Sequence, residues 1–139
     1  MARAERKLQK RLNMAKIQKK KQAKIVNHAK IFVNSSFNNT IMTATDEKGN
    51  VFAWSSTGKA GFKGTKKSTP YAATQTAKIL IDKMIDSQVS EVEIYVSGVS
   101  TGRDAALRAL GSGGFKITKI KDQTPIPHNG CRAKKPRRV

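Results

Sequence analysis

Between residues 26 and 56, hydrophobic and polar residues alternate with the period of two that is typical of β-strands. The first run carries three apolar residues at alternate positions, Ala29, Ile31 and Val33. Runs rich in β-branched residues follow at 40–45 and 51–56, and the segment 46–50 between them, Asp-Glu-Lys-Gly-Asn, has the composition of a turn. The pattern predicts three antiparallel strands within residues 26–56.

Beyond this region the period lengthens to that of an amphipathic helix. Ser68-Thr69-Pro70 supplies hydroxyl caps followed by proline at the first helical position, so we expect the helix to begin there and to end near Ser87. One side of this helix carries apolar residues, namely Ala73, Ala77, Leu80, Ile81, Met84 and Ile85. A fourth strand is expected over 89–96, a second helix over 105–110 and a short last strand over 115–120.

The order of these elements is three strands, a helix, a strand, a helix and a strand. Such an order predicts an α/β fold in which helices pack on one mixed five-stranded sheet, with the fourth strand reached through a crossover helix. A length of 139 residues fits a single domain of this kind.

The positive charge is concentrated at the two ends of the chain. Lys and Arg number 28 against 9 Asp and Glu, which gives a formal net charge of +19. Residues 1–24 hold ten basic residues and one acid, residues 116–139 hold eight and one, and residues 25–115 hold ten and seven. An excess of this size requires a polyanionic partner to neutralise it, and nucleic acid is the first candidate.

This charge pattern divides the chain into three parts. We expect a basic N-terminal extension over 1–24, disordered or helical when bound to RNA, because its few apolar positions cannot fold a free helix. Residues 25–120 are expected to form the mixed α/β domain, and 121–139 an extended basic tail. Pro125 and Pro127 stiffen this tail, so that it can follow an RNA groove without folding.

Several function classes lack the residues that they need. No apolar run approaches the roughly 18 residues of a membrane span, and no apolar segment follows the first basic residues as in a secretory signal. The single cysteine, Cys131, fits a reducing compartment. Lys63 and Lys66 stand where a nucleotide-binding P-loop needs glycine, and His28 and His128 have no partner at zinc-ligand or catalytic-triad spacing. We therefore expect no enzyme, cofactor or metal, no small-molecule substrate and no membrane.

Two glycine-rich loops follow a strand and precede a helix, where backbone N–H groups and the helix dipole attract phosphate. The first, at 57–67, contains three glycines and four lysines, Lys59, Lys63, Lys66 and Lys67. Phe62 offers a ring there for base stacking, although a flexible, solvated loop is the alternative. In the second loop, at 97–104, Arg103 either binds a phosphate or a base edge or pairs with Asp104 or another carboxylate.

The remaining candidate side chains also have two interpretations. Trp54 and Tyr95 lie on predicted strands, as a stacking platform or as half-buried packing residues. The carboxylates of the central part lie on a turn, on one strand face, on the exposed side of a helix and at Asp104. This distribution favours ordinary surface solvation over the converging acids of a two-metal nuclease.

Four segments carry a resemblance to a known family. They are Ser36-Phe-Asn-Asn-Thr-Ile41, Gly61-Phe-Lys-Gly-Thr-Lys-Lys-Ser-Thr-Pro70, Gly102-Arg103, and the tail from Asp122-Gln-Thr-Pro-Ile-Pro-His-Asn-Gly-Cys-Arg132 to Lys134-Lys135-Pro-Arg-Arg-Val139. In this order they closely resemble the universal small-subunit ribosomal protein S11 family, in its bacterial type, and the resemblance covers about residues 27–139.

The resemblance implies a ribonuclease-H-like mixed α/β fold without catalysis, in a structural constituent of the small ribosomal subunit. It also implies binding to ribosomal RNA of the central domain on the platform, near messenger RNA at the exit region and beside neighbouring platform ribosomal proteins. Such a protein supports platform assembly and translation. Together with the lysine-rich loop, the resemblance predicts RNA contacts at Asn38, Asn39, Thr40, Lys59, Lys63, Lys66, Lys67, Ser68, Arg103, His128, Asn129, Arg132, Lys134, Lys135, Arg137 and Arg138.

Two other functions stay as alternatives at this point. A nuclease on the same fold would need Asp46 or Asp104 for metal-dependent turnover, and a DNA-compacting chromosomal protein would need only the charge. The implied location is the ribosome of a bacterial cytoplasm, with a plastid or other organellar ribosome as the alternative. Asn129-Gly130 also favours deamidation to isoaspartate, because glycine leaves the succinimide route unhindered, a hypothesis that peptide mapping would test.

Overall fold

The computed structural model describes residues 25–136 and 138. The predicted N-terminal extension at 1–24 lies outside the described residues, as does Arg137. The elements in chain order are β1 (His28–Ser35), β2 (Thr40–Thr45), β3 (Val51–Ser56), the short 3-10 helix η1 (Gly64–Ser68), α2 (Pro70–Asp86), β4 (Glu91–Ser97), α3 (Gly102–Gly111) and β5 (Lys116–Asp122).

The five strands form one mixed sheet in the order β3-β2-β1-β4-β5. Strands β1, β2 and β3 pair antiparallel, whereas β1 pairs with β4 and β4 with β5 in parallel. Helix α2 is the crossover that leads from the antiparallel part to β4. These pairings confirm the predicted α/β fold with a mixed five-stranded sheet.

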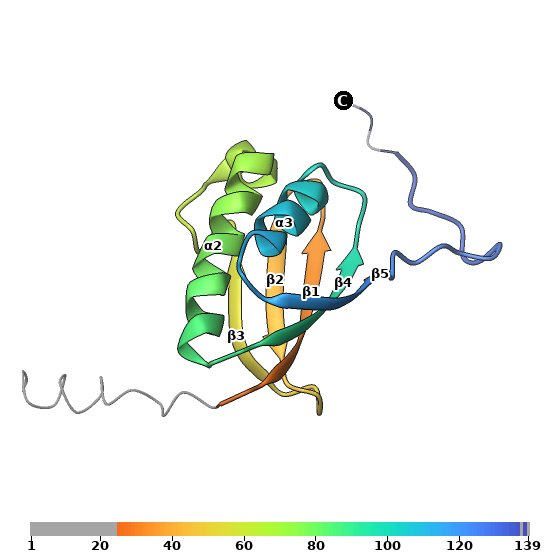
Figure 1. Ribbon diagram of the computed structural model, residues 1–139. Coiled ribbons are helices and arrows are strands. Elements are labelled where there is room, and N and C mark those ends of the chain that lie inside the picture. Colours follow the sequence, from red (N-terminus) through yellow and green to blue (C-terminus); the bar gives the residue numbers. More distant parts are fainter. Residues whose placement is uncertain (1–24, 137, 139) are drawn as a thin grey trace, which may run out of the picture.

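Both α-helices pack on the same face of the sheet, α2 over β2 and β3 and α3 over β1 (Figure 1). Every second residue of the central strands points into this layer, as the alternation of Ala29, Ile31 and Val33 predicted. The core combines these side chains with Leu80 and Met84 of α2, all of them at most 1% exposed. The opposite face of the sheet carries the polar and aromatic side chains of the strands, and no helix in the described part of the chain covers it.

Helix α2 begins where its sequence predicted. Thr69 has an extended backbone, and its hydroxyl oxygen accepts a hydrogen bond from Ala72 N–H at 3.3 Å, while Pro70 occupies the first turn. The prediction for the apolar side of this helix is wrong at one residue, because Ile85 is 57% exposed. Ile81, one turn earlier, already lies at the margin of the buried stripe.

The second helix and the last strand extend beyond their predicted bounds. Helix α3 starts at Gly102, where a Cβ would lie 2.6 Å from the Thr40 hydroxyl oxygen, so this position favours glycine. Strand β5 continues to Asp122, because its pairing with β4 extends to Val96. Among the described residues, no helix is long and apolar enough to cross a membrane.

Candidate RNA-binding surface

Three loops meet at one edge of the sheet, at the top of Figure 1. The parallel strands β1 and β4 both end there, and the antiparallel β2 begins where β3 ends. The loops comprise residues 36–39, 57–69 and 98–101, and we call the surface that they form the loop edge. The fold therefore unites segments that lie far apart in the sequence.

Hydrogen bonds tie the first two loops of the loop edge together. Thr57 N–H donates to the Thr40 carbonyl at 3.1 Å, and the Thr57 hydroxyl donates to the side-chain oxygen of Asn39 at 2.5 Å. The Thr40 side chain is fully buried, with its hydroxyl 3.2 Å from that of Ser35. Thr40 thus holds the loop in place rather than presenting a side chain to RNA, which differs from its predicted role. Asn38 is exposed and Asn39 is half-buried.

The lysine-rich loop has a defined path. Gly61 and Gly64 adopt positive φ angles of 97° and 58°, which favour glycine, and η1 follows directly. The Ser68 hydroxyl donates to the Thr65 carbonyl at 3.0 Å, so this predicted contact residue also closes the short helix. The ring of Phe62 packs edge to face against Tyr71, with ring centres 5.9 Å apart.

The four lysines of this loop concentrate positive charge at the loop edge. Lys59, Lys63 and Lys66 are exposed, and Lys67 is half-buried. Within the part of the chain that the structure describes, none of them forms a salt bridge with a carboxylate. Their charge is therefore available to an external anion, as a phosphate contact requires.

Arg103 joins the third loop to the start of the tail. Its guanidinium donates to the Gly98 carbonyl at 2.8 Å and to Asp122 Oδ2 at 2.6 Å, and it lies 3.9 Å from Asp104. The other carboxylate oxygen of Asp122 accepts from the N–H and the hydroxyl of Thr124, at 2.9 and 2.6 Å. Gly98 N–H completes the network by donating to the Thr124 hydroxyl oxygen at 3.2 Å. We call Gly98, Arg103, Asp122 and Thr124 the tail latch.

The tail latch supports the paired interpretation of Arg103, with Asp122 as its nearest carboxylate. Sequence reasoning missed Asp122 and Thr124 because they become neighbours of Arg103 only through the pairing of β4 with β5. A signal was present, since Asp122 is the one acid among residues 116–139. A carboxylate and a guanidinium form a strong charge-assisted hydrogen bond when the fold brings them together.

Replacing Asp122 with asparagine is expected to release the start of the tail. Hydrogen bonds from Thr124, then the Arg103 guanidinium, lower the pKa of Asp122 from 3.8 to about 2. Because the folded-state pKa is the lower one, the contribution of the carboxylate is present above about pH 4 and is lost as the pH falls towards 2. The protection of the Gly98 and Thr124 amides, that is the intrinsic exchange rate at a given pH divided by the observed rate, should fall in D122N, and in the original chain on acidification.

Asp104→Asn is the matched control for this experiment. Asp104 is also exposed and close to Arg103, but its contact at 3.9 Å is long. We expect exchange at the tail latch to be unchanged in D104N. Equal exchange rates in D122N and the original chain would show that the carboxylate does not hold the tail.

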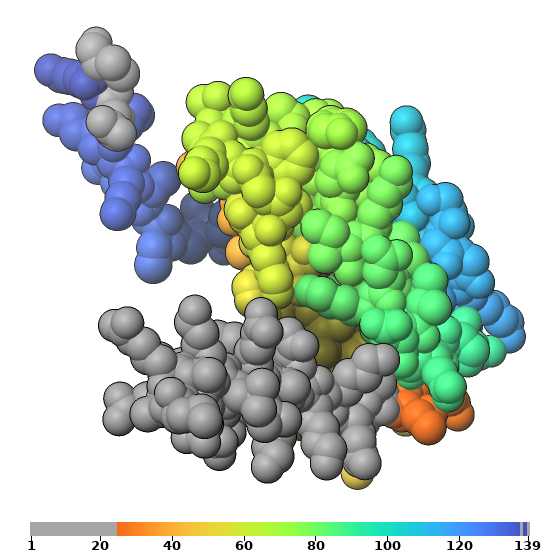
Figure 2. All heavy atoms as spheres, turned by 90° about the vertical axis from the view of Figure 1, so that its left-hand side faces the viewer, coloured from red at the N-terminus to blue at the C-terminus, as the bar shows by residue number. Residues whose placement is uncertain are grey.

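The tail beyond the latch runs away from the domain as an extended segment (Figures 1 and 2). From Pro125 onward its described residues form neither helix nor strand, and all of them are exposed. Asn129 has a positive φ of 59°, which asparagine tolerates better than most residues. The exposed polar and basic side chains are His128, Asn129, Arg132, Lys134, Lys135 and Arg138.

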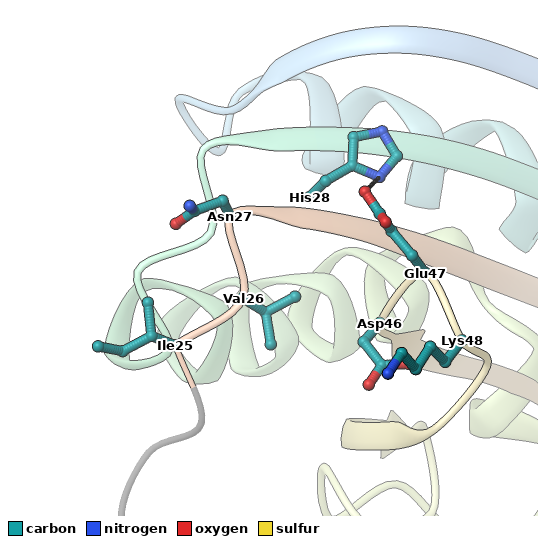
Figure 3. A pocket seen from close by; sticks show the side chains of 7 residues that line it. All are labelled: Ile25, Val26, Asn27, His28, Asp46, Glu47 and Lys48. Carbon is teal, nitrogen blue, oxygen red and sulfur yellow. Dashed lines mark ion pairs between the residues drawn. The ribbon is translucent and has the colours of Figure 1, made fainter.

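The other end of the sheet carries a pocket of about 330 Å³, drawn in Figure 3. Its lining includes His28, Asp46 and Glu47, and the imidazole of His28 lies 3.7 Å from Glu47 and 3.9 Å from Glu93. In the described ranges no group of three His, Cys, Asp or Glu side chains could hold a metal ion. Asp46 and Asp104, on which the nuclease alternative depends, lie on different elements, the turn after β2 and the first turn of α3.

Comparison with known proteins shows the family to which this chain belongs. A family model described as Ribosomal protein S11 matches residues 29–138. Curated relatives named "Small ribosomal subunit protein uS11" from Borreliella burgdorferi (strain ZS7) and Borreliella afzelii (strain PKo) are each 50% identical over 121 residues. Each match covers 87% of this chain and 93% of the relative.

These findings define the chain as a ribosomal protein, a structural constituent of the small subunit rather than an enzyme. It belongs to the ribosomal protein S11 family. The resemblance drawn from the four sequence segments is thereby confirmed, as is the prediction of a non-enzymatic protein.

Proposed function

We propose that this chain binds ribosomal RNA on the platform of the small subunit, through the loop edge and the C-terminal tail together. The observation that carries the proposal is the tail latch, which starts the basic tail at the same end of the sheet as the lysine-rich loop, although β2, β1 and β4 lie between their strands. Two cationic segments that would act separately in a flexible chain are thus held on one side of a folded body. The family supports RNA as the polyanion.

The loop edge and the tail would contribute in different ways. The lysine-rich loop is anchored by η1 and the cap of α2, so its charges bind phosphates at fixed positions. The tail has no such anchors beyond Thr124, so it would order against the RNA as it binds. Phosphate contacts of both kinds position the protein and carry little sequence information.

The finer assignments rest on the same proposal. We place the contacts in the central domain of the ribosomal RNA, near the exit of messenger RNA and beside other platform proteins, where the protein would support assembly and translation. The curated relatives come from bacteria, which supports a bacterial cytoplasm as its location. RNA contact of Asn38, Asn39 and Ser68 through the loop edge is part of the proposal, as is contact of the tail residues His128 and Asn129.

Replacing Lys63 and Lys66 with glutamine is expected to lower incorporation of the chain into small subunits. Each lysine lost removes roughly one counterion-releasing phosphate contact, so the RNA affinity should fall by about tenfold per residue near 0.1 M salt. The measured quantity is the fraction of the tagged full chain that sediments in the small-subunit peak of a sucrose gradient.

The control variant replaces Lys48 and Lys78 with glutamine. Both are exposed lysines outside the loop edge, one in the turn after β2 and one on α2, so the total charge changes equally. The control should sediment like the original chain. Equal losses in both variants would show that only total charge matters, and sedimentation with the nucleoid would favour a DNA-compacting protein.

A further inference from the structure

The face of the sheet opposite the helices carries a row of aromatic side chains. Strand register places Phe32 beside Tyr95 on one side and beside Thr43 on the other, and Thr43 beside Trp54. The row therefore crosses four strands in the order Trp54, Thr43, Phe32, Tyr95, and Lys121 of β5 continues it. We call this surface the open face.

The rings of the open face are unusually accessible for a sheet surface. Trp54 is 48% exposed and Phe32 is 37% exposed. Phe32 and Tyr95 stack on each other, with ring centres 5.2 Å apart and planes inclined by 15°. In this stacked arrangement one face of the Phe32 ring packs against Tyr95, and the other face is turned toward Thr43.

Between Phe32 and Trp54 the row contains a gap. The two residues are separated by two strand spacings, about 9.6 Å, and only the small Thr43 lies between them. A planar group stacked between two rings needs about 7–8 Å from ring to ring, because carbon atoms in contact lie about 3.5–4.0 Å apart on each side. The gap is therefore wide enough for one aromatic base, with Thr43 as its floor.

Cations border the aromatic row at both ends. Lys59 Nζ lies 4.1 Å from the centre of the Trp54 ring, and Lys119 Nζ lies 5.9 Å from that of Tyr95. The acids of this face have partners. Glu91 forms a salt bridge with Lys116, and Glu93 Oε2 accepts a hydrogen bond from the Tyr95 hydroxyl at 2.8 Å. Aromatic rings bordered by lysine match unpaired nucleotides, whose bases stack while their phosphates bind cations.

We propose that the open face is a second RNA site, which stacks unpaired bases of the ribosomal RNA on Trp54, Phe32 and Tyr95. This inference rests on the proposed function but concerns a different surface from the loop edge and the tail. The lysines that border the row favour a polyanion over a protein as the partner, because lysine is depleted in protein interfaces relative to the rest of the surface. The surface would make Lys59 a shared residue, placed between the loop edge and the aromatic row.

The intrinsic fluorescence of Trp54 tests the proposal, because it is the only tryptophan of the chain. The full chain is titrated with a short oligouridylate and, separately, with inorganic polyphosphate of equal phosphate number. Base stacking should quench the emission with the RNA and leave it nearly unchanged with polyphosphate, although both bind the basic segments. Equal changes with the two polyanions would overturn the proposal.

Variants of the row provide the second arm. Phe32→Leu and Tyr95→Leu keep an apolar side chain but remove the ring. Each should raise the RNA concentration needed for half-maximal quenching about tenfold. Ile41→Ala is the control, because Ile41 is a 42% exposed aliphatic side chain on the same sheet face. Quenching lost equally in I41A would indicate apolar docking, which overturns base stacking.

The two RNA proposals fail in distinguishable ways. Open-face variants should leave the salt dependence of RNA affinity unchanged, because they remove no positive charge. Absent quenching with normal, salt-dependent RNA affinity would overturn the open face alone. Absent RNA affinity in the original chain would overturn the proposed function itself.

Discussion

Replacing Gly98 with alanine is expected to lower the free energy of unfolding by at least about 3 kcal/mol. Gly98 has a φ of +106°, which side-chain-bearing residues rarely adopt, and an added Cβ would lie 1.9 Å from the Ser35 carbonyl oxygen. Ser35 cannot easily move away, because β1 is paired with β2 on one side and with β4 on the other. Urea denaturation followed by circular dichroism measures the change.

Variants at two other glycines separate the energetic cost of the clash from the cost of the backbone conformation. Gly114 has a φ of +78° with no atom near an added Cβ, so Gly114→Ala should cost about 1 kcal/mol through conformation alone. Gly111 ends α3 in open space at an ordinary φ, so Gly111→Ala should be neutral or slightly stabilising. A Gly98→Ala cost no larger than that of Gly114→Ala would mean that the Ser35 contact relaxes freely.

The sequence could predict those parts of the fold that depend on local signals. Alternating residues such as Ile31 and Val33, and the cap at Thr69-Pro70, are local signals, and the structure confirms the elements that they predicted. The close approach of Gly102 to Thr40 and the end of β5 at Asp122 depend instead on tertiary contacts. Such contacts join residues far apart in the sequence, so no local pattern could have predicted them.

The candidate site shows the same division. The lysine-rich loop was predictable because charge and glycine content are properties of a segment, and its four lysines do lie at one edge of the sheet. The burial of Thr40 and the engagement of Arg103 by Asp122 were not, because both follow from which loops meet. For Trp54 the sequence left two interpretations, a stacking platform and a half-buried packing residue, and its 48% exposure is compatible with both.

Replacing Arg132, Lys134 and Lys135 with glutamine is expected to cause the largest loss of RNA affinity among these variants. All three are exposed and lie in the segment without helix or strand, so they contribute charge without stabilising the domain. Losing three phosphate contacts should reduce the slope of log affinity against log salt by roughly 2 to 3. Near 0.1 M salt the affinity should fall by about 1000-fold, as measured by filter binding over a salt series.

A charge-matched variant and a latch variant complete the test of this tail. The charge-matched variant replaces Lys48, Lys78 and Arg108 with glutamine. All three are exposed and lie outside both the tail and the loop edge, so the variant removes the same charge and should leave the slope nearly unchanged. Thr124→Val removes the hydroxyl that bonds Gly98 and Asp122 and changes no charge, so it should free the start of the tail and lower affinity while preserving the slope. If the tail variant and the charge-matched variant lost affinity equally, the tail would act only as diffuse charge, and its alignment by Arg103 and Asp122 would have no part in binding.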